Sequence, residues 1–164
     1  MKPCGVLSEL NYKGNITFND YIKECKRIFK QYIYDKKFKL MGYDVRLVHN
    51  KKFDKCFNKL MKGGPLYHNK SDKYDKDRLK KIMWIHDILQ NYSLCDNENK
   101  CRGIIISMLQ HENKKNVVLY CETYNYALFF LDYTHRKRPF YMLVTAFSHI
   151  TEKKKQEIIK NKIL

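Results

Sequence analysis

The chain of 164 residues has no uninterrupted apolar run that approaches the roughly 20 residues needed for a transmembrane helix. Its first residues, MKPCGVLSEL, are also too short and polar a stretch for a signal peptide. Internal repeats and low-complexity segments are missing as well. We therefore expect a cytoplasmic protein without a membrane partner. A single domain over residues 1–164 is expected, because this length can bury a core without disulfides or metals.

Cysteine pairs with the spacing CxxC are absent, although the chain contains six cysteines. This spacing is the usual mark of a zinc site, so a zinc framework has little support. A disulfide framework does not suit a cytoplasmic chain of this size. We expect core or surface thiols, no cofactor and, if the chain is an enzyme, chemistry without a metal. The cysteines are Cys4, Cys25, Cys56, Cys95, Cys101 and Cys121.

Acidic residues are scarce relative to basic ones, with 17 Asp and Glu against 33 Lys and Arg. The formal net charge of +16 favours association with a polyanion, and it indicates a class of partner rather than a fold. Nucleic acid and an anionic membrane surface both fit this charge. Because the membrane has no other support in the sequence, nucleic acid is the first expectation.

Helical periodicity is clearest over residues 18–33, where apolar positions form one stripe and the lysines lie outside it. Thr17, with Asp20 three residues later, is close to a capping box at the start of this helix. A further helix is expected to start in the stretch KDRLKKIMWIHDIL, residues 76–89, and to run to about residue 92. Residues 53–61 match a helical face, but the segment is short, so helix and strand both remain open.

Four short runs rich in β-branched and aromatic residues follow, separated by short polar turns. Such a series predicts an antiparallel meander. The segment TEKKKQEIIKNKIL closes the chain as a basic helix, with Thr151 available as its N-cap. The four runs are IIISML, VVLYCE, YALFFL and FYMLVTAF.

The order of these elements predicts an α+β fold, with N-terminal helices packed on a four-stranded antiparallel sheet and a basic helix at the C-terminus. YDVRLV, at residues 43–48, alternates and suits a short edge strand. The polar segment 62–76, with its paired glycines and proline, is expected to be a loop. Long loops are uncommon in compact domains unless they serve binding, so this one is expected over a site.

A basic cluster of Arg78, Lys80 and Lys81 opens the helix KDRLKKIMWIHDIL, which carries the only tryptophan of the chain. Trp84 lies three residues beyond Lys81, so the two share a helix face. One interpretation is a solvated helix face with Trp84 in the core. The other is that Arg78 and Lys81 contact a phosphodiester, while Trp84 supports their side chains or stacks on a base.

Thr145, near the end of the apolar strand FYMLVTAF, supplies a second feature. Alone, it would be explained by a hydrogen bond to the backbone at a strand end. Together with the helix that carries Arg78, it resembles the barnase/EndoU/colicin/RelE-like (BECR) nucleases, in particular the branch found in phage and mobile-element genomes. The family elements stand here as RLKKIMW, YALFFL, TAF and ITEKKKQEII, and the aromatic-rich F.HL stretch is matched loosely by FNKL. The resemblance covers the chain from about residue 18 to the C-terminus.

The resemblance implies a BECR/RelE-like fold and a metal-independent endoribonuclease. Such enzymes are commonly toxins of toxin-antitoxin or phage-defence systems, which implies a cognate protein or RNA antitoxin as a second partner. Arg78 and Lys81 would bind and stabilise the scissile phosphate, and Thr145 would hydrogen-bond it. Lys59 stands where the family has a histidine, and Lys81 where it has an arginine. Lys59 or a nearby histidine would therefore move the protons, and a lysine acts as a base only where burial or neighbouring cations depress its pKa.

A non-catalytic RNA-binding protein, such as a phage-borne inhibitor that kept the fold and lost the chemistry, is the alternative. Lys59 in place of the family histidine is its main support. A DNA-binding regulator ranks below both, because no helix-turn-helix spacing is present.

A second basic cluster lies in the segment HRKRP, residues 135–139, at an expected hairpin turn. It either keeps the turn soluble or binds the RNA backbone, which would add affinity without sequence preference. Several histidines near the expected site segments are further candidates for acid-base chemistry, although a single histidine is more often structural or solvated. The RNA-binding candidates are Trp84, Lys80, His135, Arg136, Lys137 and Arg138, and the histidine candidates are His68, His86, His135 and His149.

Overall fold

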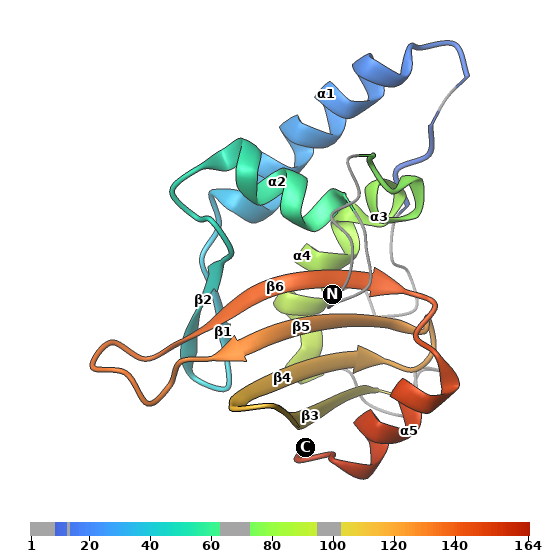
Figure 1. Ribbon diagram of the computed structural model, residues 1–164. Helices are drawn as coiled ribbons and strands as arrows, with labels where there is room; N and C mark the ends of the chain where they lie inside the picture. The colour runs from blue at the N-terminus through green and yellow to red at the C-terminus, as the bar shows by residue number, and fades with distance from the viewer. Residues whose placement is uncertain (1–8, 13, 63–72, 95–102) are drawn as a thin grey trace.

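A six-stranded mixed β-sheet forms the centre of the fold (Figure 1). The computed structural model describes residues 9–12, 14–62, 73–94 and 103–164. The strands follow the spatial order β1-β2-β6-β5-β4-β3. They are β1 (Phe38–Leu40), β2 (Tyr43–Leu47), β3 (Ile104–His111), β4 (Lys114–Cys121), β5 (Tyr126–Asp132) and β6 (Phe140–Ser148).

The prediction of a four-stranded antiparallel sheet is wrong, although the general α+β class fits. The four predicted runs are β3 to β6, each antiparallel to the next. Two more strands extend the sheet beyond β6, because β2 pairs with β6 in parallel and β1 pairs with β2. β2, predicted as an edge strand, therefore lies inside the sheet. A three-residue β1 is too short to show a period, and the partner of β2 lies near the other end of the chain, so local patterns could not reveal either pairing.

Five α-helices and two shorter helical segments complete the described part of the chain. Residues 53–61, left open between helix and strand, are helical. The helix predicted from the stretch 76–89 to about residue 92 is present but interrupted at Lys81, which divides it into two helices. The caps predicted at Thr17 and Thr151 are confirmed, since each hydroxyl accepts a hydrogen bond from the amide three residues later. The helices are α1 (Phe18–Phe29), α2 (Phe53–Met61), α3 (Lys76–Lys80), α4 (Ile82–Asn91) and α5 (Glu152–Lys160), with a π-helical turn η1 (Lys30–Tyr34) and a 3-10 turn η2 (Tyr92–Leu94).

Each face of the sheet has its own hydrophobic core. The larger core joins α1, α2 and α4 to one face, and the smaller core joins α5 to the other face through the fully buried Ile158. Cys25 and Cys56 lie in the larger core, and burial raises the pKa of both thiols to about 12. These two cysteines are therefore inert core thiols at neutral pH.

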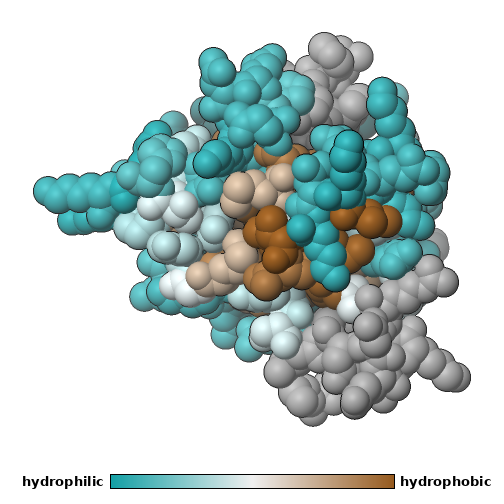
Figure 2. Space-filling model, turned by 90° about the horizontal axis from the view of Figure 1, so that it is seen from below, coloured by the Kyte–Doolittle hydropathy of each residue, from teal (hydrophilic) through white to brown (hydrophobic). Residues whose placement is uncertain are grey.

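The C-terminal residues extend the sheet along the outer edge of β3. The amide of Ile163 donates to the carbonyl of Ile106 at 2.8 Å, and the amide of Ile106 donates to the carbonyl of Leu164 at 3.0 Å. The side chains of Ile163 and Leu164 are exposed. Seen from below, the molecule presents an apolar area bordered by hydrophilic residues (Figure 2). None of the described helices is long and apolar enough to span a membrane.

Candidate functional site

A β-bulge in β6 determines where the last side chains of this strand point. Phe129 lies opposite Thr145 but Phe130 lies opposite Leu143, so that Val144 is the extra residue. Leu143 faces the larger core. With regular alternation Thr145 would face the same core, and the bulge turns it to the other side.

The residues after the bulge lie along a part of β6 that no strand covers on the β2 side. β2 pairs with β6 only as far as Leu143, and beyond that point α2 and α3 flank the strand. Ala146 belongs to the larger core, and Phe147 packs on the smaller one. Ser148 returns to the side of α3, where its hydroxyl contacts Asp77.

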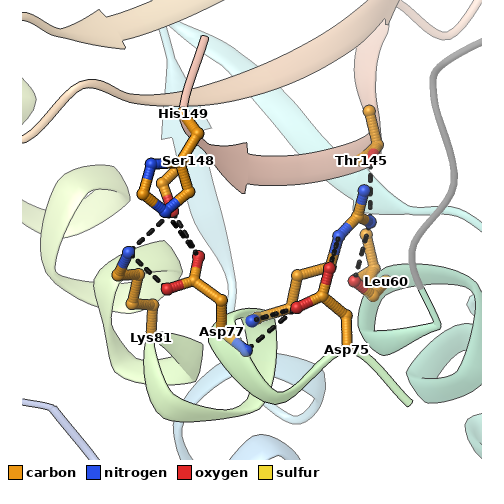
Figure 3. Close-up of polar contacts among 8 residues, drawn as sticks. Leu60, Asp75, Asp77, Lys81, Thr145, Ser148 and His149 are labelled. Atoms are coloured by element: carbon orange, nitrogen blue, oxygen red, sulfur yellow. Dashed lines mark hydrogen bonds and ion pairs between the residues drawn. The ribbon is translucent and has the colours of Figure 1, made fainter.

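Arg78, on α3, connects α2 to the end of β6. Its Nη1 donates to the carbonyl of Leu60 and to Oγ1 of Thr145, each at 3.2 Å (Figure 3). The guanidinium carbon lies 5.3 Å from the centre of the Phe147 ring, and only 7% of the residue is exposed. Burial lowers the pKa of Arg78, while the charge of Asp75, 3.8 Å from Nε, opposes the shift. A guanidinium remains protonated under such conditions.

Lys81, Asp77 and Ser148 form a compact hydrogen-bonded group beside Arg78 (Figure 3). Nζ of Lys81 donates to Oγ of Ser148 at 2.7 Å and lies 2.6 Å from the carboxylate of Asp77, and the Ser148 hydroxyl donates to the same carboxylate. Burial raises the pKa of Asp77, but these hydrogen bonds and the charges of Lys81 and His149 outweigh it. The pKa of Asp77 therefore lies below its ordinary value.

His149 stands at the solvent side of this group. Its side chain is 82% exposed, and Nε2 lies 3.9 Å from the Asp77 carboxylate. The backbone has a φ of 59°, which is uncommon for a residue other than glycine. Asn125 holds this conformation from both sides, because its carbonyl accepts from the amide of His149 and its Nδ2 donates to the carbonyl of Ile150. Such fixed, unfavourable backbone conformations are concentrated at functional sites.

Trp84 lies in the core beneath Lys81. It is 4% exposed and packs edge-on against Tyr124 and Tyr126, with ring centres 5.2 Å apart in both cases. Nζ of Lys81 lies 5.0 Å from the centre of the Trp84 ring, close enough for a cation-π interaction. The tryptophan is thus placed to support Lys81 and not at the surface, where a base would stack. The simpler interpretation is confirmed in placing Trp84 in the core, but Arg78 and Lys81 are buried as well and do not form the solvated helix face that it predicted.

Lys59 lies on the exposed side of α2 and makes no hydrogen bond or ion pair with any residue that the structure describes. Its neighbour Leu60 provides the carbonyl that accepts from Arg78, so the backbone of Lys59 is close to the site. Lys80 instead points to the N-terminal segment, where its Nζ lies 2.9 Å from Glu9. The structure thus separates Lys80 from Arg78 and its partners.

The other sequence candidates lie away from Arg78 and Thr145. His135 to Arg138 form the exposed turn between β5 and β6, at the opposite end of β6 from Thr145. His86 is hydrogen-bonded to Asp87 and packs against Tyr32 and Phe38. His68 lies outside the described residues.

Asp77 and Ser148 are members of the site that sequence reasoning missed. Asp77 and Lys81 are four residues apart, and this spacing on a helix predicts an ion pair, so the sequence does contain a signal for Asp77. Ser148 gave no comparable signal, because only the bulge in β6 turns it toward α3.

The arrangement combines two buried cations, the carboxylate of Asp77 that pairs with Lys81, two hydroxyl groups and an exposed imidazole. Cations and hydroxyls can bind a phosphate oxygen, and an imidazole can transfer a proton. Within the described ranges, no group of three or more His, Cys, Asp and Glu side chains is placed to hold a metal ion. Comparison of the chain with protein-family models, with curated proteins and with solved structures finds no match.

Proposed function

We propose that the chain is a metal-independent endoribonuclease that acts in the cytoplasm as a toxin of a toxin-antitoxin or phage-defence system. The observation that carries this proposal is the meeting of Arg78 and Lys81 with the hydroxyls of Thr145 and Ser148, beside the exposed imidazole of His149. The resemblance of the same segments to the BECR nucleases supports it. The net charge of +16 supports RNA as the substrate.

The proposed reaction needs no cofactor, because the nucleophile is the 2′-OH of the RNA. A base removes the proton of this hydroxyl, the 2′-oxygen bonds to phosphorus, and the bond from phosphorus to the 5′-oxygen breaks. An acid gives a proton to the leaving 5′-oxygen. The products are a 2′,3′-cyclic phosphate and a 5′-OH end. The protein must supply two proton-transfer groups and positive charge for the phosphorane.

His149 and Lys59 are the side chains that we assign to proton transfer. Both are exposed, unlike Arg78 and Lys81, so both can meet an RNA strand arriving from solvent. The imidazole of His149 faces Asp77, which orients it and balances its positive charge when it is protonated. Arg78 and Lys81 then supply positive charge in a poorly solvated place, where it stabilises a phosphorane more strongly than it would in water, although the carboxylate of Asp77 offsets part of the charge of Lys81.

The proposal is tested by incubating end-labelled RNA with the purified protein in EDTA and identifying the ends produced. We expect cleavage to persist and to leave 2′,3′-cyclic phosphates. His149→Ala should slow cleavage about 100-fold, and added imidazole should restore part of it. His49→Ala is the matched control, since His49 is also exposed and has a φ of 54°, and it should cleave like wild type.

Cleavage that EDTA abolishes and magnesium restores would overturn the metal-independent mechanism. If the wild type binds RNA but leaves it intact, the chain is the non-catalytic RNA-binding protein. Lys59, in place of the family histidine, is the observation that favours this second function.

A further inference from the structure

We propose that a cavity between two hairpins, at the other end of the sheet from Thr145, is a second RNA-binding site that holds the phosphodiester backbone of a single strand. The hairpins are the turn between β3 and β4 and the turn between β5 and β6, which projects at the left of Figure 1. This inference rests on the proposed RNA substrate and is independent of cleavage.

The cavity has a volume of about 530 Å³, within the range of roughly 300 to 1,000 Å³ that is usual for ligand sites. Its lining includes Lys114 and Lys115 from one hairpin and Arg136 from the other, against the single carboxylate of Asp132. Asp132 is already engaged, since its Oδ1 accepts from both the amide and the hydroxyl of Thr134. The cavity is therefore lined by a surplus of positive charge.

The cations of this cavity are available to a ligand. Lys114, Lys115 and Arg136 are exposed, and none of them forms an ion pair with a residue in the described part of the chain. On α1, in contrast, Arg27 and Lys23 are paired with neighbouring acids. A hydrophilic projection is visible at this end of the molecule when it is seen from below (Figure 2).

A stack of rings and guanidinium groups fixes the arginines of this end. The guanidinium of Arg136 lies 4.3 Å from the centre of the Tyr133 ring, and this ring packs on the ring of Phe140, with 5.1 Å between the two ring centres. The guanidinium of Arg46 lies 4.1 Å from the centre of the Phe140 ring. Stacking occupies the faces of a guanidinium and leaves its N–H edges for phosphate oxygens. Loose surface charge would lack this order, so the stack favours a phosphate ligand over a merely solubilising role.

The geometry of β6 connects the cavity to the proposed cleavage site. Phe140, beside the hairpin, and Thr145 are five residues apart in one strand, or roughly 17 Å at about 3.3 Å per residue. One RNA strand can therefore lie along the molecule and contact both places. The projecting hairpins argue against a membrane surface, which would need a flat or apolar face.

The test measures binding of a fluorescent oligouridylate of about 20 nucleotides with 2′-O-methyl groups, which cannot be cleaved by 2′-OH attack. The triple variant Lys114→Gln/Lys115→Gln/Arg136→Gln removes three charges from the cavity. Its matched control, Lys153→Gln/Lys160→Gln/Lys162→Gln, removes three exposed charges from α5 and the C-terminal segment. We expect the cavity variant to bind the RNA about tenfold more weakly than wild type, while the control binds almost as well as wild type. The slope of log affinity against log salt concentration should become less steep by about 2 in the cavity variant.

Equal losses in the two variants would overturn the proposal, because binding would then follow net charge alone. Arg136→Lys, which keeps the charge but loses the planar fork, should weaken binding severalfold, and binding equal to wild type would likewise contradict a built site. Competition by polyglutamate as effective as that by unlabelled RNA would also overturn it. If the cavity variant loses binding but the wild type never cleaves RNA, this inference stands and the proposed ribonuclease fails.

Discussion

Lys59 lies one residue before the carbonyl that accepts a hydrogen bond from Arg78, and its amine is exposed to solvent. If it is one of the two proton-transfer groups, Lys59→Ala should reduce the rate of RNA cleavage about 100-fold or more, the usual effect of losing such a group. RNA binding should weaken only slightly, since the buried cations remain. Single-turnover cleavage and filter binding on the same RNA measure the two effects.

Lys59→His introduces the histidine of the BECR nucleases that the chain resembles, and it serves as the companion variant. It should retain activity, with a pH optimum shifted toward the imidazole range near roughly 6.5. Creation of activity by Lys59→His in an inactive wild type would identify a binding protein built on a former nuclease. If the wild type cleaves RNA and Lys59→Ala cleaves it at the same rate, the assignment of FNKL to the site is wrong.

Asp77 ties its neighbours together through a carboxylate whose pKa is below the ordinary value. A group with a depressed folded pKa stabilises the protein above its unfolded pKa, near about 3.9 for aspartate, and this contribution is lost as the pH falls through the folded value. Asp77→Asn should therefore lower the free energy of unfolding at neutral pH, and the difference from wild type should shrink below about pH 4. Urea unfolding across this pH range measures it.

The control is Asp54→Asn, because Asp54 is 71% exposed and pairs with Lys26 only at the surface. Exposed pairs of this kind contribute little, so this variant should unfold like wild type at every pH. An Asp77→Asn variant with the same small effect would mean that the group around Lys81 is weakly coupled to folding.

Helices and strands that periodicity or a capping residue marks in the sequence could be predicted. Strand pairings between segments far apart in the chain could not. Periodicity and capping residues in the sequence indicate α1, α5 and the strands β3 to β6. β1 was missed because three residues are too few to show a period, and β2, expected as an edge strand, was not expected inside the sheet because its parallel pairing with β6 leaves no trace in neighbouring residues. The candidate site follows the same division: Arg78, Lys81 and Thr145 were grouped from the sequence and lie close together, whereas Ser148 joins them only through the bulge at Val144.

α5 begins at Glu152, three residues after His149, which links the stability of this helix to the site. Thr151, its N-cap, accepts from the amide of Lys154, as Thr17 accepts from Asp20 at the start of α1. Thr151→Ala and Thr17→Ala should each lower the free energy of unfolding by about 1 kcal/mol. Only Thr151→Ala should also slow cleavage, because it loosens the segment that holds His149. Urea midpoints and RNA cleavage rates of both variants test this. Equal cleavage rates in the two variants would mean that the stability of α5 does not affect the site.

Many acidic side chains form ion pairs with lysines and arginines of the same chain, while other cations remain available to a partner. Exposed acids on α1 and in the sheet, such as Asp20, Glu24 and Asp44, pair with neighbouring lysines and arginines. The cations of the β5–β6 turn have no such partners among the described residues. A net charge of +16 with such cations at this turn favours association with a polyanion.

Binding to generic RNA should therefore weaken steeply with salt, because each phosphate that meets a cation releases counterions. For a single strand the slope of log affinity against log salt is about −0.7 per phosphate contact, so several contacts predict a slope steeper than about −2. Titration of an uncleavable RNA at a series of salt concentrations measures this slope, with an uncharged polymer as the control ligand. Absent or salt-independent RNA binding would contradict both the ribonuclease and the RNA-binding function, since each requires the positive surface to neutralise the backbone of the nucleic acid.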